Sequence, residues 1–87
     1  MREIKIQIPE YNRHLEFVWE ADPKIKAYPQ FDALIIQANR DGLVSLARHI
    51  LLLAQDDVPS GCHFHLDEYN DLEDGSFELI VAKKEDL

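Results

Sequence analysis

Apolar and polar side chains alternate in several short stretches of the chain, which is the pattern of β-strands with one buried face. The alternation and the turn-forming residues between the stretches predict five strands, at residues 3–8, 14–20, 31–38, 62–68 and 76–83. The first two are separated by a short turn and are expected to form an antiparallel hairpin. The segment between the second and third strands contains Pro23 and Pro29, so it is interpreted as a connecting loop.

Residues 39–55 are the one stretch with a helical period. With Ile50 at the centre, the predicted buried stripe consists of Leu43, Leu46, Ala47, Ile50, Leu53 and Ala54. Asn39 is suited to cap the first turn, which Gly42 weakens by about 1 kcal/mol relative to alanine. Leu51 and Leu52 fall outside this stripe, so either a loop covers them or they belong to a partner surface.

The order of these elements, β-β-β-α-β-β, predicts a single α+β domain over residues 1–87. We expect a five-stranded, mixed and mostly antiparallel sheet with the helix packed on one face. The strands that flank the helix are expected to run parallel through a right-handed crossover. The second face of this sheet has no helix to cover it and is a candidate interface. By alternation, that face carries Val18, Ile35, Ile80, His63 and His65.

The formal net charge of −8 is unevenly distributed along the 87 residues. No Lys or Arg occurs between Arg48 and Lys83, although Asp and Glu are frequent there. Such a chain should repel nucleic acids and anionic membranes, so neither is an expected partner. A basic protein partner fits the charge, and solubility alone is the other explanation.

The acidic loop DEYNDLED, at residues 67–74, joins the last two predicted strands. An aromatic and an aliphatic side chain among carboxylates is a plausible way to hold a basic protein surface. The predicted partner-binding residues are Asp67, Glu68, Tyr69, Asp71, Leu72, Glu73 and Asp74. In the alternative interpretation, the loop is a simple connection and Leu72 turns back into the protein. The loop lacks the glycine and the ligand spacing of an EF-hand, so calcium is not expected.

His63 and His65 lie two residues apart on a predicted strand, so both imidazoles point from one face. Asp67 continues this row, and the three side chains are candidate ligands for zinc or another divalent metal. Alternatively, the histidines are exposed cross-strand partners, for instance of Glu78. No nucleophile–base motif or phosphate-binding glycine loop is present, so we predict no enzyme activity and no cofactor.

Cys62 is the only cysteine, so no intrachain disulfide can form and a reducing, cytoplasmic location is expected. The alternating N-terminus lacks the apolar core of a signal peptide. The longest apolar run, residues 50–54, is too short to span a bilayer.

Three segments resemble the immunity protein 32 family of bacterial polymorphic toxin systems. They are ANRDGLVSLARHILLLAQ at residues 38–55, HFHLDEY at residues 63–69 and LEDGSFELIV at residues 72–81. The resemblance implies a small α+β protein that protects a cell from a toxin without catalysing a reaction. It implies no cofactor and no established binding residue.

Three functions remain open from the sequence. The first is a protein-binding antitoxin that neutralises a basic toxin through its acidic surface. The second is a small metal-binding protein or metal-dependent enzyme that uses His63 and His65. The third is a homodimeric accessory domain in which the uncovered sheet face pairs with its own copy.

Overall fold

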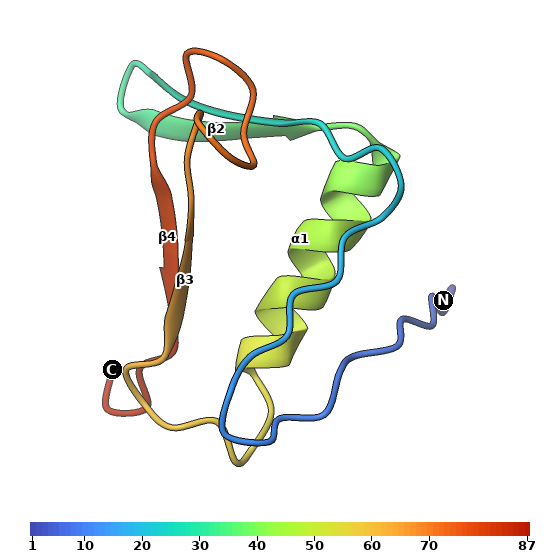
Figure 1. Ribbon diagram of the computed structural model, residues 1–87. Helices are drawn as coiled ribbons and strands as arrows, with labels where there is room; N and C mark the ends of the chain where they lie inside the picture. Colours follow the sequence, from blue (N-terminus) through green and yellow to red (C-terminus); the bar gives the residue numbers. More distant parts are fainter.

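Two β-hairpins and one helix make up the regular structure of the computed structural model, which describes residues 1–87. Strand β1 (Ile25–Gln30) pairs with β2 (Ala33–Ala38), and helix α1 (Arg40–Leu53) follows directly. Strand β3 (His63–Leu66) pairs with β4 (Leu79–Ala82). The β1–β2 hairpin lies across one end of the molecule, and α1 and the β3–β4 hairpin extend from it side by side (Figure 1).

The α+β class and the helix are confirmed, but the expected five-stranded sheet is wrong. The structure has two separate two-stranded antiparallel sheets, so β2 and β3 are not joined by a parallel crossover. Residues 3–8 and 14–20 are not strands, and the predicted loop at residues 21–30 contains β1. The other three strands and the helix lie within or close to their predicted ranges.

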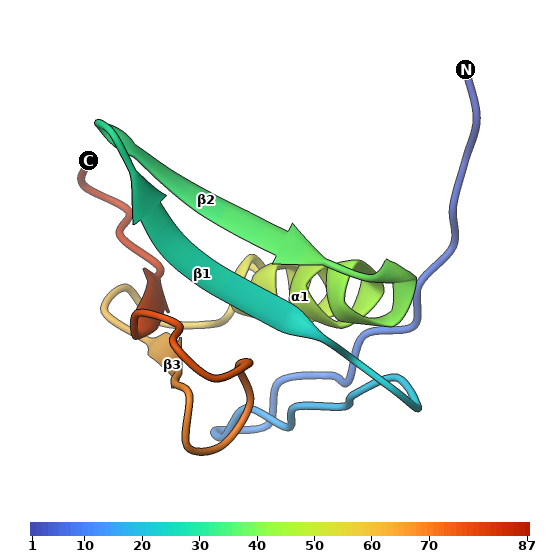
Figure 2. The same cartoon turned by 90° about the horizontal axis from the view of Figure 1, so that it is seen from above.

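In residues 14–20 apolar and polar side chains alternate because one side of this extended segment packs on the core. The segment is not paired with a strand. Half-buried against the core are Leu15, Phe17 and Trp19. The backbone of this segment is hydrogen-bonded by side chains of α1 instead of by a neighbouring strand. The Glu20 N–H donates to Ser45 Oγ at 2.9 Å, and Arg48 Nη1 donates to the Val18 carbonyl at 3.3 Å. The segment therefore covers one side of the helix, as Figure 2 shows.

The buried face of α1 is rotated from the predicted one. Its buried residues are Gly42, Ser45, Leu46, His49, Leu52 and Leu53, so the face centres on His49 and not on Ile50. Leu43 and Ile50, from the predicted stripe, are 53% and 44% exposed. The rotation arises because the irregular segment before β1 covers the side of the helix that carries Ser45 and Leu52.

The start of α1 is fixed tightly against the start of β1. Asn39 Oδ1 accepts hydrogen bonds from the N–H groups of Gly42 and Lys24 at 2.8 and 3.0 Å, which confirms the predicted cap. A Cβ atom on Gly42 would lie 2.6 Å from the Lys24 carbonyl oxygen and 2.8 Å from Ile25 Cγ1. Only glycine allows this approach of helix and strand.

The segment at residues 73–77 covers the free edge of β1. The N–H groups of Glu73 and Phe77 donate to the carbonyls of Ile25 and Ala27, both at 2.8 Å. Ile25 and Ala27 are fully buried and anchor the core between the two hairpins and the helix. The helix has neither the length nor the apolar character needed to cross a membrane.

Candidate functional site

The outer face of the β3–β4 hairpin displays both histidines of β3. Phe64 and Leu66 point into the core, whereas His63 and His65 are exposed. The strand register sets His65 opposite Ile80, whose side chain is also exposed. These three residues therefore share one surface.

Val18 and Ile35 do not join this surface, because the sheet that was expected to carry them does not exist. Val18 lies in the irregular segment beside Arg48. Ile35 lies in β2, which belongs to the other hairpin. The structure thus replaces the predicted continuous sheet face with a smaller one, on β3 and β4 alone.

The acidic loop, residues 67–74, leaves β3 in a turn held by its own hydrogen bonds. The Asp67 carbonyl accepts from the N–H groups of Asp71 and Leu72 at 3.1 and 2.9 Å. Asp67 Oδ1 accepts from the Tyr69 N–H at 2.9 Å. Further along, Glu68 Oε2 accepts from the Gly75 N–H at 2.8 Å. These bonds fix the backbone of the loop and hold the carboxylates of Asp67 and Glu68 in defined positions.

The two apolar anchors predicted in the acidic loop lie in opposite environments. Tyr69 is 87% exposed and can contact a partner. Leu72 is only 5% exposed and packs in the hydrophobic core. Leu72 therefore holds the loop against the protein and is not available as a contact, which matches the alternative interpretation of the sequence.

No Lys or Arg side chain balances the carboxylates of the acidic loop. No ion pair is formed by Asp67, Glu68, Asp71, Glu73 or Asp74. The pKa of Asp71 is raised by burial and by the charge of Asp67, and nearby His65 opposes this rise. Burial is the main cause of the raised pKa, and the repulsion from Asp67 adds to it.

A cavity of about 320 Å³ opens beside the acidic loop. Its lining combines aromatic rings with a carboxylate and two imidazoles: Phe17, Trp19, His63, Phe64, His65, Leu66 and Asp71. Aromatic walls next to a carboxylate suit a Lys or Arg side chain, which gains both a charge partner and contact with a ring. Sequence reasoning missed this cavity because it is formed by segments far apart along the chain.

His49 lies behind the wall of this cavity and is fully buried. Its ring packs edge-on against Phe17 and Trp19, with centroid distances of 5.0 and 4.4 Å, and neither ring nitrogen has a hydrogen-bond partner. Burial, and to a lesser extent the charge of Arg48, lowers the pKa of His49 to about 4. The imidazole is therefore neutral near pH 7 and serves as packing.

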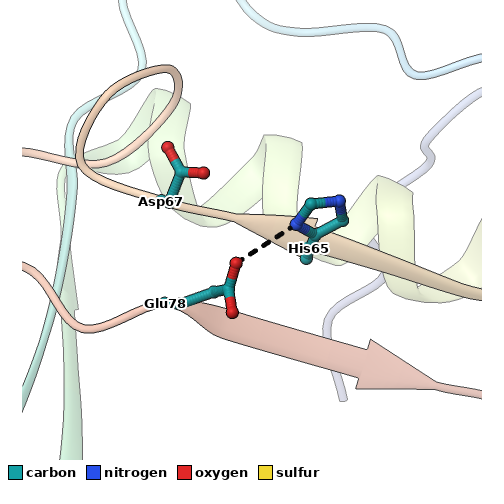
Figure 3. A group of neighbouring side chains, drawn as sticks. All are labelled: His65, Asp67 and Glu78. Carbon is teal, nitrogen blue, oxygen red and sulfur yellow. Dashed lines mark hydrogen bonds and ion pairs between the residues drawn. The ribbon is translucent and has the colours of Figure 1, made fainter.

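Three potential metal ligands converge at the junction of the acidic loop and the hairpin. The donor atoms of His65, Asp67 and Glu78 all lie within 4.8 Å of one another. Figure 3 shows the Glu78 carboxylate directed at the His65 imidazole, with Oε2 3.3 Å from Nδ1. The structure thus brings together two of the three ligands proposed from the sequence, with Glu78 in place of His63. His63 instead directs its Nδ1 to the Gly61 carbonyl oxygen at 3.3 Å.

This donor set, one imidazole and two carboxylates, fits a divalent cation that keeps several water ligands. The side chains of His65 and Glu78 are both more than half exposed, so a bound ion would remain in contact with solvent. The sequence proposed Glu78 as a cross-strand partner of the histidines, and that contact is present for His65. The strand register, which the sequence did not provide, is what brings Glu78 to this position.

Residues 33–84, more than half of the chain, match the model of the family described as immunity protein 32. The matched range contains β2, α1, β3, the acidic loop and β4. Neither the search of curated proteins nor that of solved structures gave a match. The family match confirms the resemblance found in the sequence.

Proposed function

The chain belongs to the immunity protein 32 family, and from this premise we propose that it neutralises a toxin by binding a basic surface of that toxin. The contact surface is the acidic loop together with the outer face of β3 and β4. One observation carries the proposal: the five carboxylates of the loop form no ion pair within the chain. Their charge is therefore available to an external partner.

The charge of the acidic loop attracts a basic surface of the toxin, and Tyr69 and the neighbouring cavity provide contacts that fit its shape. Tyr69 is the exposed aromatic side chain of the loop, and aromatic residues often dominate the energy of protein interfaces. The cavity beside Asp71 accommodates a basic side chain of the toxin against Trp19. Because the loop is already held by internal hydrogen bonds, little ordering entropy is lost when the complex forms.

A charge-reversal experiment tests this surface, with a toxin that the protein is shown to bind as the partner. The double variant Glu73→Lys/Asp74→Lys reverses two exposed carboxylates of the loop. Association should slow by about tenfold at low salt, and the difference should shrink as salt is added. The rates are measured by stopped-flow mixing at two salt concentrations.

The matched control is Asp56→Lys/Asp57→Lys. It reverses two exposed carboxylates in the turn after α1, which lies at the end of the helix away from the β1–β2 hairpin (Figure 1), and it changes the net charge by the same amount. Association of the control should change by less than about twofold. Equal slowing in both variants would mean that net charge alone matters and that the acidic loop is not the contact. Failure of the wild-type chain to protect cells that express the toxin would refute the antitoxin function itself.

The converging donor atoms of His65, Asp67 and Glu78 favour a second candidate, divalent metal binding. Titration of the untagged protein with Zn²⁺ or Mn²⁺ in a calorimeter tests it directly. Binding of one ion that is lost in Glu78→Gln and kept in His63→Gln would support this site. Equal binding by both variants would exclude it.

A further inference from the structure

The outer edge of β2, the side that faces away from β1, is an unpaired strand edge. The β1–β2 sheet has only two strands, and no other backbone hydrogen bond involves residues 33–38. Every second residue along this edge therefore presents a free N–H and C=O. The corresponding edge of β1 is covered by residues 73–77, so β2 carries the open side of this sheet (Figure 2).

Nothing in β2 protects this edge from pairing with another strand. Its sequence, ALIIQA, contains no charged residue and no proline, the two features that usually prevent strand addition. Leu34 is 57% exposed and Ile36 is also exposed. An uncharged apolar edge in a chain of net charge −8 is suited to accept a further strand.

The N-terminal arm, residues 1–8, has the alternating pattern of a strand but is not paired with another strand. Ile4, Ile6 and Ile8 alternate with polar residues, yet the arm forms no backbone–backbone hydrogen bond. Its one hydrogen bond is from Arg48 Nε to the Gln7 carbonyl, at 3.1 Å. Ile4 is 76% exposed, and both views show the arm projecting away from the rest of the chain (Figures 1 and 2).

We propose that the N-terminal arm of one copy adds to the outer edge of β2 in a second copy, and that reciprocal exchange forms a symmetric dimer. Each β1–β2 sheet then gains a third strand, which uses the free backbone groups of both segments. The exchanged arm does not add to the repulsion between the two acidic chains. Arg2, Glu3 and Lys5 give the arm a net charge of +1, so the remainder of each chain carries −9.

The dimer surface is separate from the proposed toxin surface. The acidic loop and residues 73–77 lie on the β1 side of the first hairpin, whereas the arm docks on the β2 side. The inference therefore goes beyond the antitoxin function and does not depend on it. A dimer formed in this way presents two acidic loops.

Two measurements on the full chain test the exchange. The first is the mass in solution by analytical ultracentrifugation, which should approach twice the 10.1 kDa of one chain as concentration rises. The second is amide hydrogen exchange. In the isolated chain the amides of residues 3–8 donate no hydrogen bond, so they should exchange freely. In the dimer, these amides and those of β2 should slow together by at least about tenfold.

Two substitutions at exposed positions separate this dimer from others. Ile4→Lys should abolish the dimer and the concentration-dependent protection of β2, although β2 itself is unchanged. Leu34→Lys should abolish protection of residues 3–8, although the arm is unchanged. Ile80→Lys, at an equally exposed position on β4, is the matched control and should leave both signals intact.

Three results would overturn the proposal. One is a monomer at every concentration with free exchange at residues 3–8. Another is protection of β2 without protection of the arm, which indicates edge-to-edge pairing of two β2 strands. The third is a dimer that survives Ile4→Lys, which places the contact elsewhere.

Discussion

The buried imidazole of His49 should make the stability of this protein sensitive to mild acid. Its pKa is lowered from 6.5 to about 4 in the folded state, so between these values the unfolded chain binds more protons. The free energy of unfolding therefore rises with pH through this interval and decreases as pH falls. With these two pKa values, the loss attributable to His49 between pH 7 and pH 5 is about 2 kcal/mol.

The substitution His49→Leu removes this dependence while keeping an apolar side chain of similar size. At pH 7 it has two opposing effects. It removes two buried nitrogens without hydrogen-bond partners, which stabilises the protein, and it removes edge-on contacts with Phe17 and Trp19, which destabilises it. Each effect is about 1 kcal/mol, so the variant should be close to wild type at pH 7 and about 2 kcal/mol more stable than wild type at pH 5.

Urea denaturation followed by the fluorescence of Trp19 measures these differences. This residue is the only tryptophan and packs 4.4 Å from the His49 ring, centroid to centroid. The carboxylates contribute equally to wild type and variant, so they cancel in the comparison. His14→Gln, at an exposed histidine, is the control and should follow the wild type at both pH values. A wild-type-minus-variant difference that stays constant between pH 7 and pH 5 would refute the reasoning.

Substitutions at three further positions test the contacts at the ends of the first hairpin, each by thermal or urea denaturation. Gly42→Ala should destabilise the protein by about 2 kcal/mol despite a better helix propensity, because the new Cβ meets the Lys24 carbonyl at 2.6 Å. Asn39→Ala should cost about 2 kcal/mol, and Asn39→Asp less than half of that, because aspartate keeps both accepted bonds and loses only the one donated to the Asp22 carbonyl. Phe31→Gly should stabilise by up to about 1 kcal/mol, because Phe31 has a φ of 56° in the turn between β1 and β2. The argument for Gly42 would be contradicted if Gly42→Ala were more stable than wild type. The argument for Asn39 would be contradicted by equal losses in its two variants, and that for Phe31 by a Phe31→Gly variant that is less stable than wild type.

The second half of the chain could be predicted well from its sequence because its signals are local. Asn39 begins the helix with a hydrogen bond to the third residue after it, and the turn at Asp74-Gly75 precedes a strand with regular alternation. Alternation also decides which side chains of β3 point outward. None of these features depends on a distant segment.

The helix face could not be predicted because it depends on distant segments. A count of apolar positions treats His49 and Ser45 as polar and so turns the buried face toward Ile50. In the structure Ser45 accepts a hydrogen bond from the backbone of Glu20, and aromatic rings from two other segments enclose His49. In the same way, the sequence indicates only that Gly42 weakens the helix, whereas in the structure Gly42 allows close contact between α1 and β1.

Strand β1 was not predicted because its residue composition is unusual for a strand. Pro29 and two nearby lysines are typical of a loop, and only Ile25 and Ala27 carry the apolar side of the strand. Pro29 is tolerated because it lies near the end of a two-stranded sheet, opposite Leu34. The strand therefore forms because Ile25 and Ala27 are buried, although the residues around them favour a turn.

Residues 3–8 and 14–20 show that the alternation of apolar and polar residues indicates an apolar face but does not indicate that the segment is paired as a strand. Both stretches alternate, and neither is hydrogen-bonded as a strand. For residues 14–20 the reason is visible, since their apolar side chains pack on the core and side chains of α1 bind their backbone. For residues 3–8 the cover within one chain is only partial: Ile6 and Ile8 are half-buried and Arg48 binds the Gln7 carbonyl, but Ile4 remains exposed and no strand pairs with the segment. The same pattern is thus explained within the chain for residues 14–20 but only in part for residues 3–8, which is why we infer that the arm pairs with the outer edge of β2 in a second copy.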